Sequence, residues 1–250
     1  MIEAIQIDMS YREKIYQKYA ERFQIQGYAR KDVAERWAVG YRYFLRGWLP
    51  GDPGSRIADV GCGGGQLLGA FRIMGYRTLA GVDISEQQVA RAQEAGFAVE
   101  AGDAIGYLRR HEGEFDLVTA IDIAEHLTKD ELMEFLERAY AALRPGGRLI
   151  LQMPNPNSPF GMRIRYGDLT HEVGLSPDCA ERLLGLLGFE ALESREAGPV
   201  PGWKSPSGSL RWVLWQLVRL AFSAFDLIET GGRGIGVFTR VYLVCGRRLR

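Results

Sequence analysis

The sequence has few cysteines and no long apolar run, and each absence excludes a class of protein. Its 250 residues include three cysteines, Cys62, Cys179 and Cys245, which lie far apart and form no CxxC pair. An odd number of scattered thiols argues against a disulfide framework and favours a reducing, cytoplasmic compartment. No stretch of about 18 uninterrupted apolar residues occurs, so we predict no transmembrane helix. The first residues carry acids where a signal peptide needs basic residues and an apolar run, so we predict no export signal.

The chain also lacks an excess of charge of either sign. It has 31 basic and 31 acidic side chains, which gives a net charge of zero. A protein that binds nucleic acid through the phosphates usually presents a basic surface, and the sequence has no basic stripe that would provide one. The overall balance therefore argues against nucleic acid as the partner.

Apolar segments typical of strands and helices alternate from residue 56 onward. Such alternation predicts an α/β domain, a doubly wound parallel sheet with helices on both faces. The predicted strands cover 56–60, 77–83, 98–103, 115–121, 148–154, about 189–196 and 237–246. The predicted helices between them cover 65–75, 85–96, 104–111, 128–143, 176–188 and about 209–229.

A run of small residues follows the first strand. Asp59, Gly61, Gly63 and Gly65 fit the pattern D-x-G-x-G-x-G. A strand, a glycine-rich turn and a helix bring backbone N–H groups and the positive end of the helix to one point, where a ligand can lie against the chain.

Two acids and the loop cysteine complete this pattern. Asp83 ends the second strand, about twenty residues after the glycines, where an acid can accept both hydroxyls of a ribose. Asp103 ends the third strand, where it is placed to meet an adenine amino group. Cys62, inside the loop, is interpreted as a small packing residue rather than a nucleophile.

Five segments together resemble the class I S-adenosylmethionine-dependent methyltransferases. They are DVGCGGG, GVDIS, AGDA, FDLVTAIDIAEHL and LRPGGRLILQMPN, in this order between residues 56 and 153. The resemblance implies a Rossmann-like seven-stranded sheet in the order 3-2-1-4-5-7-6, with strand 7 antiparallel. It also implies that S-adenosylmethionine binds and that S-adenosylhomocysteine is the product. The residues implied to bind it are Asp59, Gly61, Cys62, Gly63, Gly65, Asp83, Ile84, Asp103 and Ala104.

The resemblance divides the chain into two parts. Residues 51–250 form the methyltransferase domain, and residues 1–50 form an N-terminal helical lid. Segments of this kind fold over the cofactor and the acceptor in the resembling family. The tyrosines of the lid either line the pocket or pack against the edge of the sheet; they are Tyr11, Tyr16, Tyr19 and Tyr28.

A polar cluster follows the fourth strand, where ligands of doubly wound sheets lie. Asp122, Glu125 and His126 have the spacing D-x-x-E-H, and one helical turn would bring them to one side. A second cluster, YGDLTHE, follows the fifth strand and includes His171. Because the two strands are neighbours, roughly 5 Å apart, His126 and His171 are expected to meet over the site. Two histidines and two carboxylates form a plausible set of ligands for a divalent ion such as Mg²⁺.

The first cluster resembles the E-x-x-E-H motif of ubiquinone-biosynthesis O-methyltransferases and of small-RNA 2′-O-methyltransferases. In those families the two acids and the histidine bind a metal near the acceptor hydroxyl. Here Asp122 stands in place of the first glutamate. Three interpretations of His126 stay open: a metal ligand, a metal-free base or acceptor contact, and a structural role. His171 is either a ligand and catalytic partner or a loop histidine bonded to Asp168.

The site predicts transfer of a methyl group to a hydroxyl oxygen. An alcohol must lose its proton as the new bond forms, and a base or a cation assists that loss. An N-P-P-[YF] motif after the fourth strand would suggest a nitrogen acceptor. The segment MPNPN at 153–157 is similar to this motif but follows the fifth strand, which argues against a nitrogen acceptor. The expected acceptor is a small molecule, a glycan precursor or a lipid-like compound. The alternatives are an RNA 2′-O-methyltransferase and a non-catalytic module that only binds S-adenosylmethionine.

The helix at 209–229 carries a narrow polar stripe on an otherwise apolar surface. Such a wide apolar face must be covered by something. Three interpretations stay open: packing on the sheet, a homodimer contact or wall of the acceptor site, and peripheral contact with a membrane.

Overall fold

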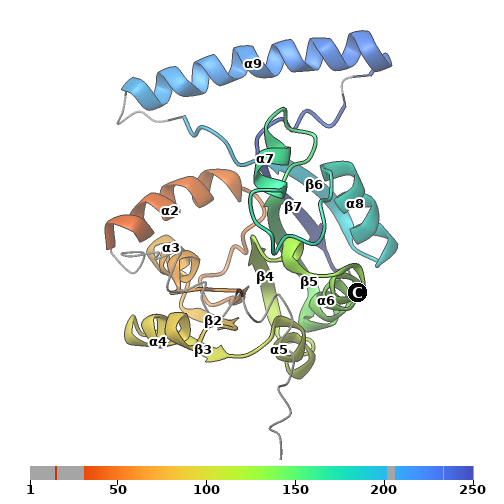
Figure 1. The fold of residues 1–250 in the computed structure, drawn as a ribbon. Coiled ribbons are helices and arrows are strands. Elements are labelled where there is room, and N and C mark those ends of the chain that lie inside the picture. Colours follow the sequence, from red (N-terminus) through yellow and green to blue (C-terminus); the bar gives the residue numbers. More distant parts are fainter. Residues whose placement is uncertain (1–14, 16–30, 202–205, 233, 250) are drawn as a thin grey trace, which may run out of the picture.

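The computed structural model describes residue 15 and residues 31–201, 206–232 and 234–249 (Figure 1). Within these residues the chain forms a seven-stranded sheet in the order β3-β2-β1-β4-β5-β7-β6. Strand β7 is antiparallel to its neighbours β5 and β6, and the other strand pairs are parallel. The predicted doubly wound sheet, its order and its antiparallel seventh strand are therefore confirmed.

The elements follow the predicted alternation closely. The strands are β1 (Arg56–Val60), β2 (Thr78–Asp83), β3 (Ala98–Ala101), β4 (Phe115–Ile121), β5 (Leu143–Pro154), β6 (Glu190–Glu196) and β7 (Val241–Arg247). The helices include α2 (Lys31–Phe44), α3 (Gln66–Met74), α4 (Glu86–Glu94), α5 (Ala104–Arg110), the 3₁₀ turn η1 (Ala124–His126), α6 (Lys129–Ala142), α7 (Gly161–Arg165), α8 (Pro177–Leu186) and α9 (Pro206–Thr230).

Two strands begin four or five residues away from the predicted position, and pairing explains both. Strand β7 begins at Val241 rather than at 237, because Val241 pairs with Pro154, the last residue of β5. Strand β5 begins at Leu143 rather than at 148, because Leu143 already pairs with Phe115 before a register shift in β4.

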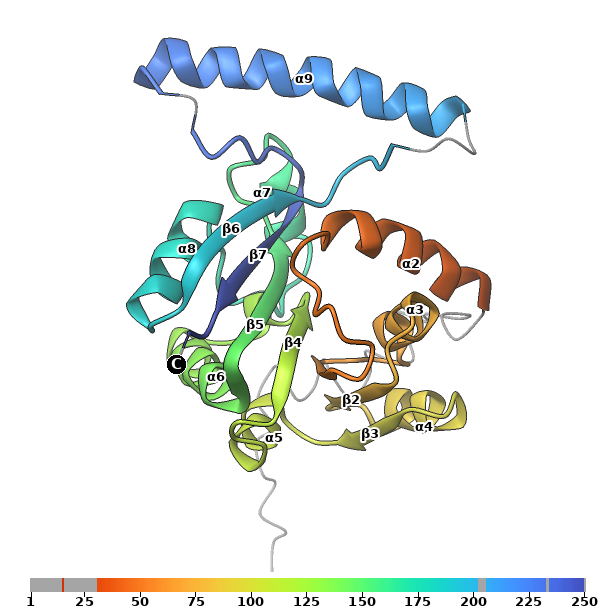
Figure 2. The same cartoon turned by 180° about the vertical axis from the view of Figure 1, so that it is seen from behind.

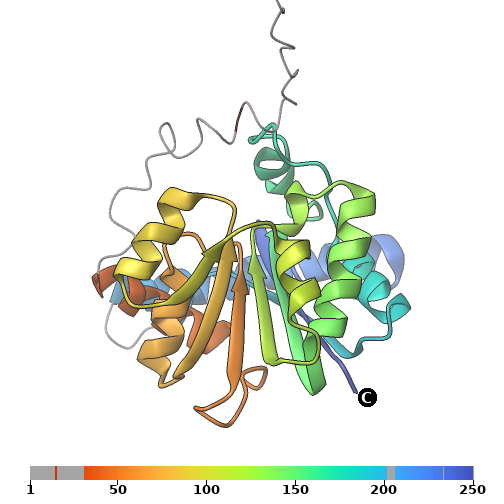
Figure 3. The ribbon, with the colours of Figure 1, turned by 90° about the horizontal axis from the view of Figure 1, so that it is seen from below.

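Helices cover both faces of the sheet (Figures 2 and 3). One core cluster packs α2 and α3 against the sheet and contains Tyr41, Phe71 and Ile57. The cluster on the opposite face packs α5, α6 and α8 and contains Ala58. The neighbours Ile57 and Ala58 fall in different clusters because successive side chains of a strand point to opposite faces.

The predicted lid at 1–50 lies largely outside the described residues, and so do its four tyrosines. The described part of this segment includes α2, whose Ala38 and Tyr41 are buried, together with Leu45 and Trp48 beyond its end. This part packs against α3 and the sheet, so it belongs to the core of the domain.

Helix α9 does not pack on the sheet, which corrects the first of the three interpretations given above. It is 25 residues long, and none of its residues is buried. Figures 1 and 2 show it lying apart from the sheet. Its polar stripe is turned toward the body of the protein, so the apolar side is left outside. Among the described helices, none is long and apolar enough to cross a membrane.

Candidate active site

The loop between β1 and α3 carries the glycines of the D-x-G-x-G-x-G pattern. Gly61, Gly63 and Gly65 have φ angles of 72°, 52° and 83°, in the left-handed region that side chains disfavour. The N–H groups of Gly61 and Cys62 donate to the carbonyl oxygen of Val82, at 2.8 and 3.0 Å. No described side chain caps the N-terminus of α3. The helix therefore directs its first N–H groups and its positive end toward this loop.

Steric contacts also require a glycine at position 61. A Cβ at this position would lie 2.1 Å from Cδ1 of Ile123, the residue that precedes η1. The glycine loop therefore touches the segment that follows β4, and the two halves of the candidate site share this contact.

Asp83 holds the glycine loop from the end of β2. Its Oδ2 accepts from the N–H of Gly63 at 2.8 Å, and its Oδ1 accepts from the N–H of Ser85 at 2.9 Å. Burial raises the pKa of Asp83 although both backbone hydrogen bonds lower it. A carboxylate has about four lone-pair sites, so acceptor capacity is left for hydroxyl groups. The next residue, Ile84, is 66% exposed, an unusual position for an apolar side chain.

Asp59 is buried beneath the loop at the end of β1. Its Oδ1 accepts a 2.7 Å hydrogen bond from the hydroxyl of Thr119. Burial raises the pKa of Asp59 to about 7, the nearby charge of Asp83 adds to the rise, and the Thr119 hydrogen bond opposes it. A cation bound nearby would favour the ionised carboxylate.

Strand β3 ends at Ala101 rather than at the predicted Asp103, so Asp103 and Ala104 lie at the start of α5. The Oδ1 of Asp103 accepts from the N–H of Gly106 at 2.6 Å, so this acid caps the helix. Cys62 is buried, and burial raises the pKa of its thiol, which agrees with a packing role.

A hydrogen-bonded chain fixes Asp122 at the end of β4. The hydroxyl of Tyr41 donates to Oε1 of Gln152 at 3.1 Å, and Nε2 of Gln152 donates to Oδ1 of Asp122 at 3.1 Å. Asp122 has a φ of 56°, and burial raises the pKa of its carboxyl group. Its side chain is thus held toward β5 by a buried amide.

The backbone at Glu125 joins the two polar clusters. The N–H groups of Glu172 and Val173 donate to the carbonyl oxygen of Glu125, at 2.7 and 3.2 Å. Arg165 supports this junction, since its guanidinium donates to the carbonyl oxygens of His171 and Glu172. The rings of His126 and His171 consequently lie 4.7 Å apart, so their predicted meeting is confirmed.

The protein sets the proton positions on both neutral imidazoles. The hydroxyl of Thr170 donates its proton to Oδ1 of Asp168 at 2.7 Å. The same hydroxyl oxygen lies 2.9 Å from Nδ1 of His126, so it accepts the hydrogen bond from that nitrogen. Nδ1 of His171 lies 3.2 Å from the carbonyl oxygen of Arg165, which accepts only. In its neutral form each ring therefore carries its proton on Nδ1 and its lone pair on Nε2, the arrangement expected of a base or a metal ligand.

Glu125 lies beside the two histidines. Its side chain is buried, and Oε2 has no hydrogen-bond partner among the described residues. Ligand atoms of Glu125, His126 and His171 lie within 4.8 Å of one another, a group able to hold a metal ion. The fourth predicted ligand, Asp122, is not part of this group.

A family model described as a methyltransferase domain matches residues 28–194, more than half of the chain. The chain belongs to this methyltransferase family. The predicted resemblance to class I S-adenosylmethionine-dependent methyltransferases is thereby confirmed.

Curated relatives match part of this methyltransferase. One is the 27-O-demethylrifamycin SV methyltransferase of Amycolatopsis mediterranei, 31% identical over 55% of this chain and 60% of the relative. Another is the ubiquinone biosynthesis O-methyltransferase of Thiobacillus denitrificans, 35% identical over 42% of this chain and 47% of the relative. The matched part is about half the length of these relatives.

Solved structures show the same fold over nearly the whole methyltransferase. A SAM-dependent methyltransferase from Archaeoglobus fulgidus superposes with a TM-score of 0.62 at 23% identity, covering 93% of this chain and 99% of that one. Another from Mesorhizobium loti gives a TM-score of 0.57 at 21% identity, covering 84% of this chain and 98% of that one.

The sequence reasoning missed several residues that shape the methyltransferase site. Gln152 and Thr170 orient Asp122 and His126, and Ile123 packs on the glycine loop. Two sequence signals were available for these residues. One is a polar glutamine inside the apolar segment LILQMP, and the other is the D-x-T spacing of Asp168 and Thr170.

Replacing Gly61 by alanine should abolish binding of S-adenosylhomocysteine, measured by calorimetry. The left-handed φ costs about 1–2 kcal/mol for alanine, and overlap with Ile123 adds about 1–3 kcal/mol. Gly113→Ala is the matched control, because Gly113 has a φ of 68° and no atom within 4 Å of an added Cβ. Equal losses of stability in urea for both variants would contradict a role for Ile123.

Replacing Thr170 by valine should remove the preference of His126 for the Nδ1–H form. Long-range ¹H–¹⁵N spectra measure this directly, since the chain has three histidines and His111 serves as internal reference. Thr170→Ser retains a hydroxyl and should retain the preference. An unchanged His126 signal in the valine variant would refute the orientation described above.

Proposed function

We propose that this protein transfers the methyl group of S-adenosylmethionine to a hydroxyl oxygen of a small-molecule, glycan-precursor or lipid-like acceptor. The observation that carries the proposal is the contact between a nucleotide-type glycine loop and a rim that holds two oriented histidines. The O-methyltransferase names of the two curated relatives agree with an oxygen acceptor.

The glycine loop fits the donor. Gly61, Gly63 and Gly65 provide backbone without side chains, and the first turn of α3 provides N–H groups for a carboxylate. In this proposal Asp59 and Cys62 belong to the end that seats the methionine part. Asp83 and Ile84 contact the ribose and the adenine face, and Asp103 and Ala104 contact the adenine edge.

Catalysis of this reaction consists mainly of aligning the acceptor oxygen with the methyl carbon and the sulfur atom. The acceptor oxygen forms a bond to the methyl carbon while the carbon–sulfur bond breaks, and the hydroxyl proton passes to Nε2 of His126. Positioning of this kind supplies about 7–11 kcal/mol of the barrier reduction. A placed base adds a factor of about 10² to 10⁴. His171 lies beside His126 and contacts the acceptor in the same proposal.

Glu125, His126 and His171 also fit a divalent ion such as Mg²⁺. The buried Oε2 of Glu125 has no partner among the described residues, and both imidazoles have their lone pairs on Nε2. When bound, such an ion would lower the pKa of the acceptor hydroxyl. Asp122, whose carboxylate accepts from Gln152, lies outside this set.

Replacing His126 by alanine should lower methyl transfer by a factor of about 10² to 10⁴, because the proton acceptor is lost. S-adenosylhomocysteine affinity should change less than about twofold, since His126 lies outside the glycine loop. Donor labelled with ¹³C at the methyl group, offered with a panel of phenols and alcohols, gives the rate and the methylated atom by NMR. Label on nitrogen, or a matching loss of product affinity, would contradict the assignment.

Titration of chelator-treated protein with Mn²⁺ tests the metal set separately. We expect heat from one saturable site, and its loss in Glu125→Gln and His171→Ala. Glu112→Gln is the control, because Glu112 is exposed and outside the group. Heat that persists in both site variants, or no heat in the wild type, would remove the metal from the proposal and leave His126 as a metal-free base.

A further inference from the structure

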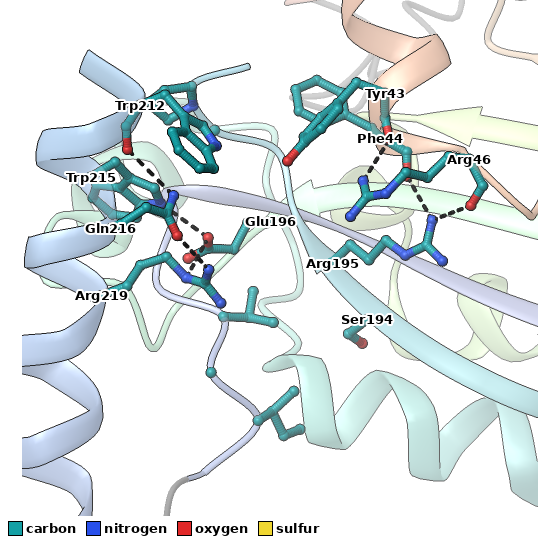
Figure 4. A pocket seen from close by; sticks show the side chains of 15 residues that line it. Tyr43, Phe44, Arg46, Ser194, Arg195, Glu196, Trp212, Trp215, Gln216 and Arg219 are labelled. Carbon is teal, nitrogen blue, oxygen red and sulfur yellow. Dashed lines mark hydrogen bonds and ion pairs between the residues drawn. The ribbon is translucent and has the colours of Figure 1, made fainter. Parts of the chain in front are cut away.

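Helix α9 is attached to the body of the protein by its polar side. The indole N–H of Trp215 donates to Oε2 of Glu196 at 3.0 Å, and Nε of Arg219 lies 3.0 Å from the same oxygen (Figure 4). Further along the helix, the ring of Phe222 lies 5.4 Å from that of Phe238. These contacts fix which side of α9 faces inward.

A groove of about 290 Å³ separates α9 from the body. Figure 4 shows its lining, with Trp212 and Gln216 on the helix side and Arg195 on the other. The guanidinium of Arg195 donates to the carbonyl oxygens of Phe44 and Arg46, at 3.0 and 2.6 Å. The Arg195 contacts stay within the body of the protein, and across the groove Trp215 and Arg219 of α9 are joined to Glu196 of β6.

The outward side of α9 is apolar along almost its whole length. Between Trp212 and Glu229 every exposed residue of the helix is apolar. At 100° per residue these positions cover an arc of about 180°. They are Val213, Leu214, Leu217, Val218, Leu220, Ala221, Ala224, Phe225, Leu227 and Ile228. Leu220 is 68% exposed and Ile228 is 86% exposed, so large apolar side chains face solvent.

A second copy of the chain covers this face poorly. The apolar side from Val213 to Ile228 extends about 24 Å at 1.5 Å per residue, and helices pack about 10 Å apart. A helix-to-helix contact would therefore bury about 240 Å² on each partner, against about 800 Å² in a typical stable interface. A single partner helix also covers a narrower apolar stripe than an arc of about 180°, so part of the apolar side would stay exposed. The hydrocarbon region of a bilayer accommodates the whole arc.

We propose that α9 lies in the surface of a phospholipid bilayer, with its outward side among the acyl chains. The charged residues of the helix cancel, with Arg211 and Arg219 against Asp226 and Glu229. Apolar burial rather than attraction to anionic lipids therefore drives the contact. Strands β5 and β6 are both antiparallel to β7, so β6 ends at the same edge as β4 and β5. Helix α9, which follows β6, places this edge toward the lipid.

The inference is independent of the proposed reaction and is tested on the full chain without donor or acceptor. Flotation with phosphatidylcholine vesicles should carry the protein to the lipid fraction equally at low and high salt. The double variant Leu217→Glu/Leu220→Glu should bind at least about tenfold more weakly, because each leucine loses apolar burial. Leu186→Glu is the matched control, since Leu186 on α8 is 78% exposed. Circular dichroism should show all three proteins equally folded.

Three outcomes would overturn the inference. The first is no flotation with phosphatidylcholine vesicles. The second is flotation only with phosphatidylglycerol vesicles and only at low salt, which would indicate electrostatic attraction instead. The third is a dimer in lipid-free sedimentation equilibrium that the double variant dissociates, which would assign the outward side of α9 to a second copy.

Discussion

Two backbone N–H groups, those of Glu172 and Val173, donate to one carbonyl oxygen, that of Glu125, and the rest of the candidate site depends on this junction. It joins the segment after β4 to the segment after α7, which are about 45 residues apart in the chain. Together with the hydrogen bond between Thr170 Oγ1 and Nδ1 of His126, it brings the two histidines from separate loops to one place. With it, their rings lie 4.7 Å apart beside a buried carboxylate.

The donor half and the acceptor half of the site are coupled through packing as well. Ile123 fills the space above Gly61, and Asp122 beside it is held by Gln152 and, through Gln152, by Tyr41 of α2. Tyr41 of α2 is therefore linked to the end of β4 by hydrogen bonds that do not involve the glycine loop. This arrangement gives the residues before the sheet a direct part in shaping the site.

Local patterns predicted the elements that local physics determines. The predicted helices at 85–96, 128–143 and 176–188 begin after the N-caps Ser85, Thr128 and Ser176, because each side chain satisfies an N–H group of its own first turn. The order of the sheet came from the resemblance, which carries long-range pairing that periodicity alone does not. The meeting of His126 and His171 followed from strand adjacency.

The remaining features depend on tertiary contacts that leave weak traces in the sequence. The role of Thr170 requires both the Asp168 carboxylate and the His126 ring, which lie in different segments. The displacement of Asp122 from the metal group requires a glutamine on the neighbouring strand. The orientation of α9 is set by Glu196, a residue of β6, so its polar stripe could equally have been placed against solvent.

The apolar residues on the outward side of α9 are positions at which the folded monomer tolerates polar substitutions. Its leucines contribute little to the folding free energy of the isolated chain, because substitutions at exposed positions usually change stability by less than about 0.5 kcal/mol. Polar replacements there would cost the monomer almost nothing and would improve its solubility. The folding free energy of the monomer therefore does not account for an apolar composition at these positions.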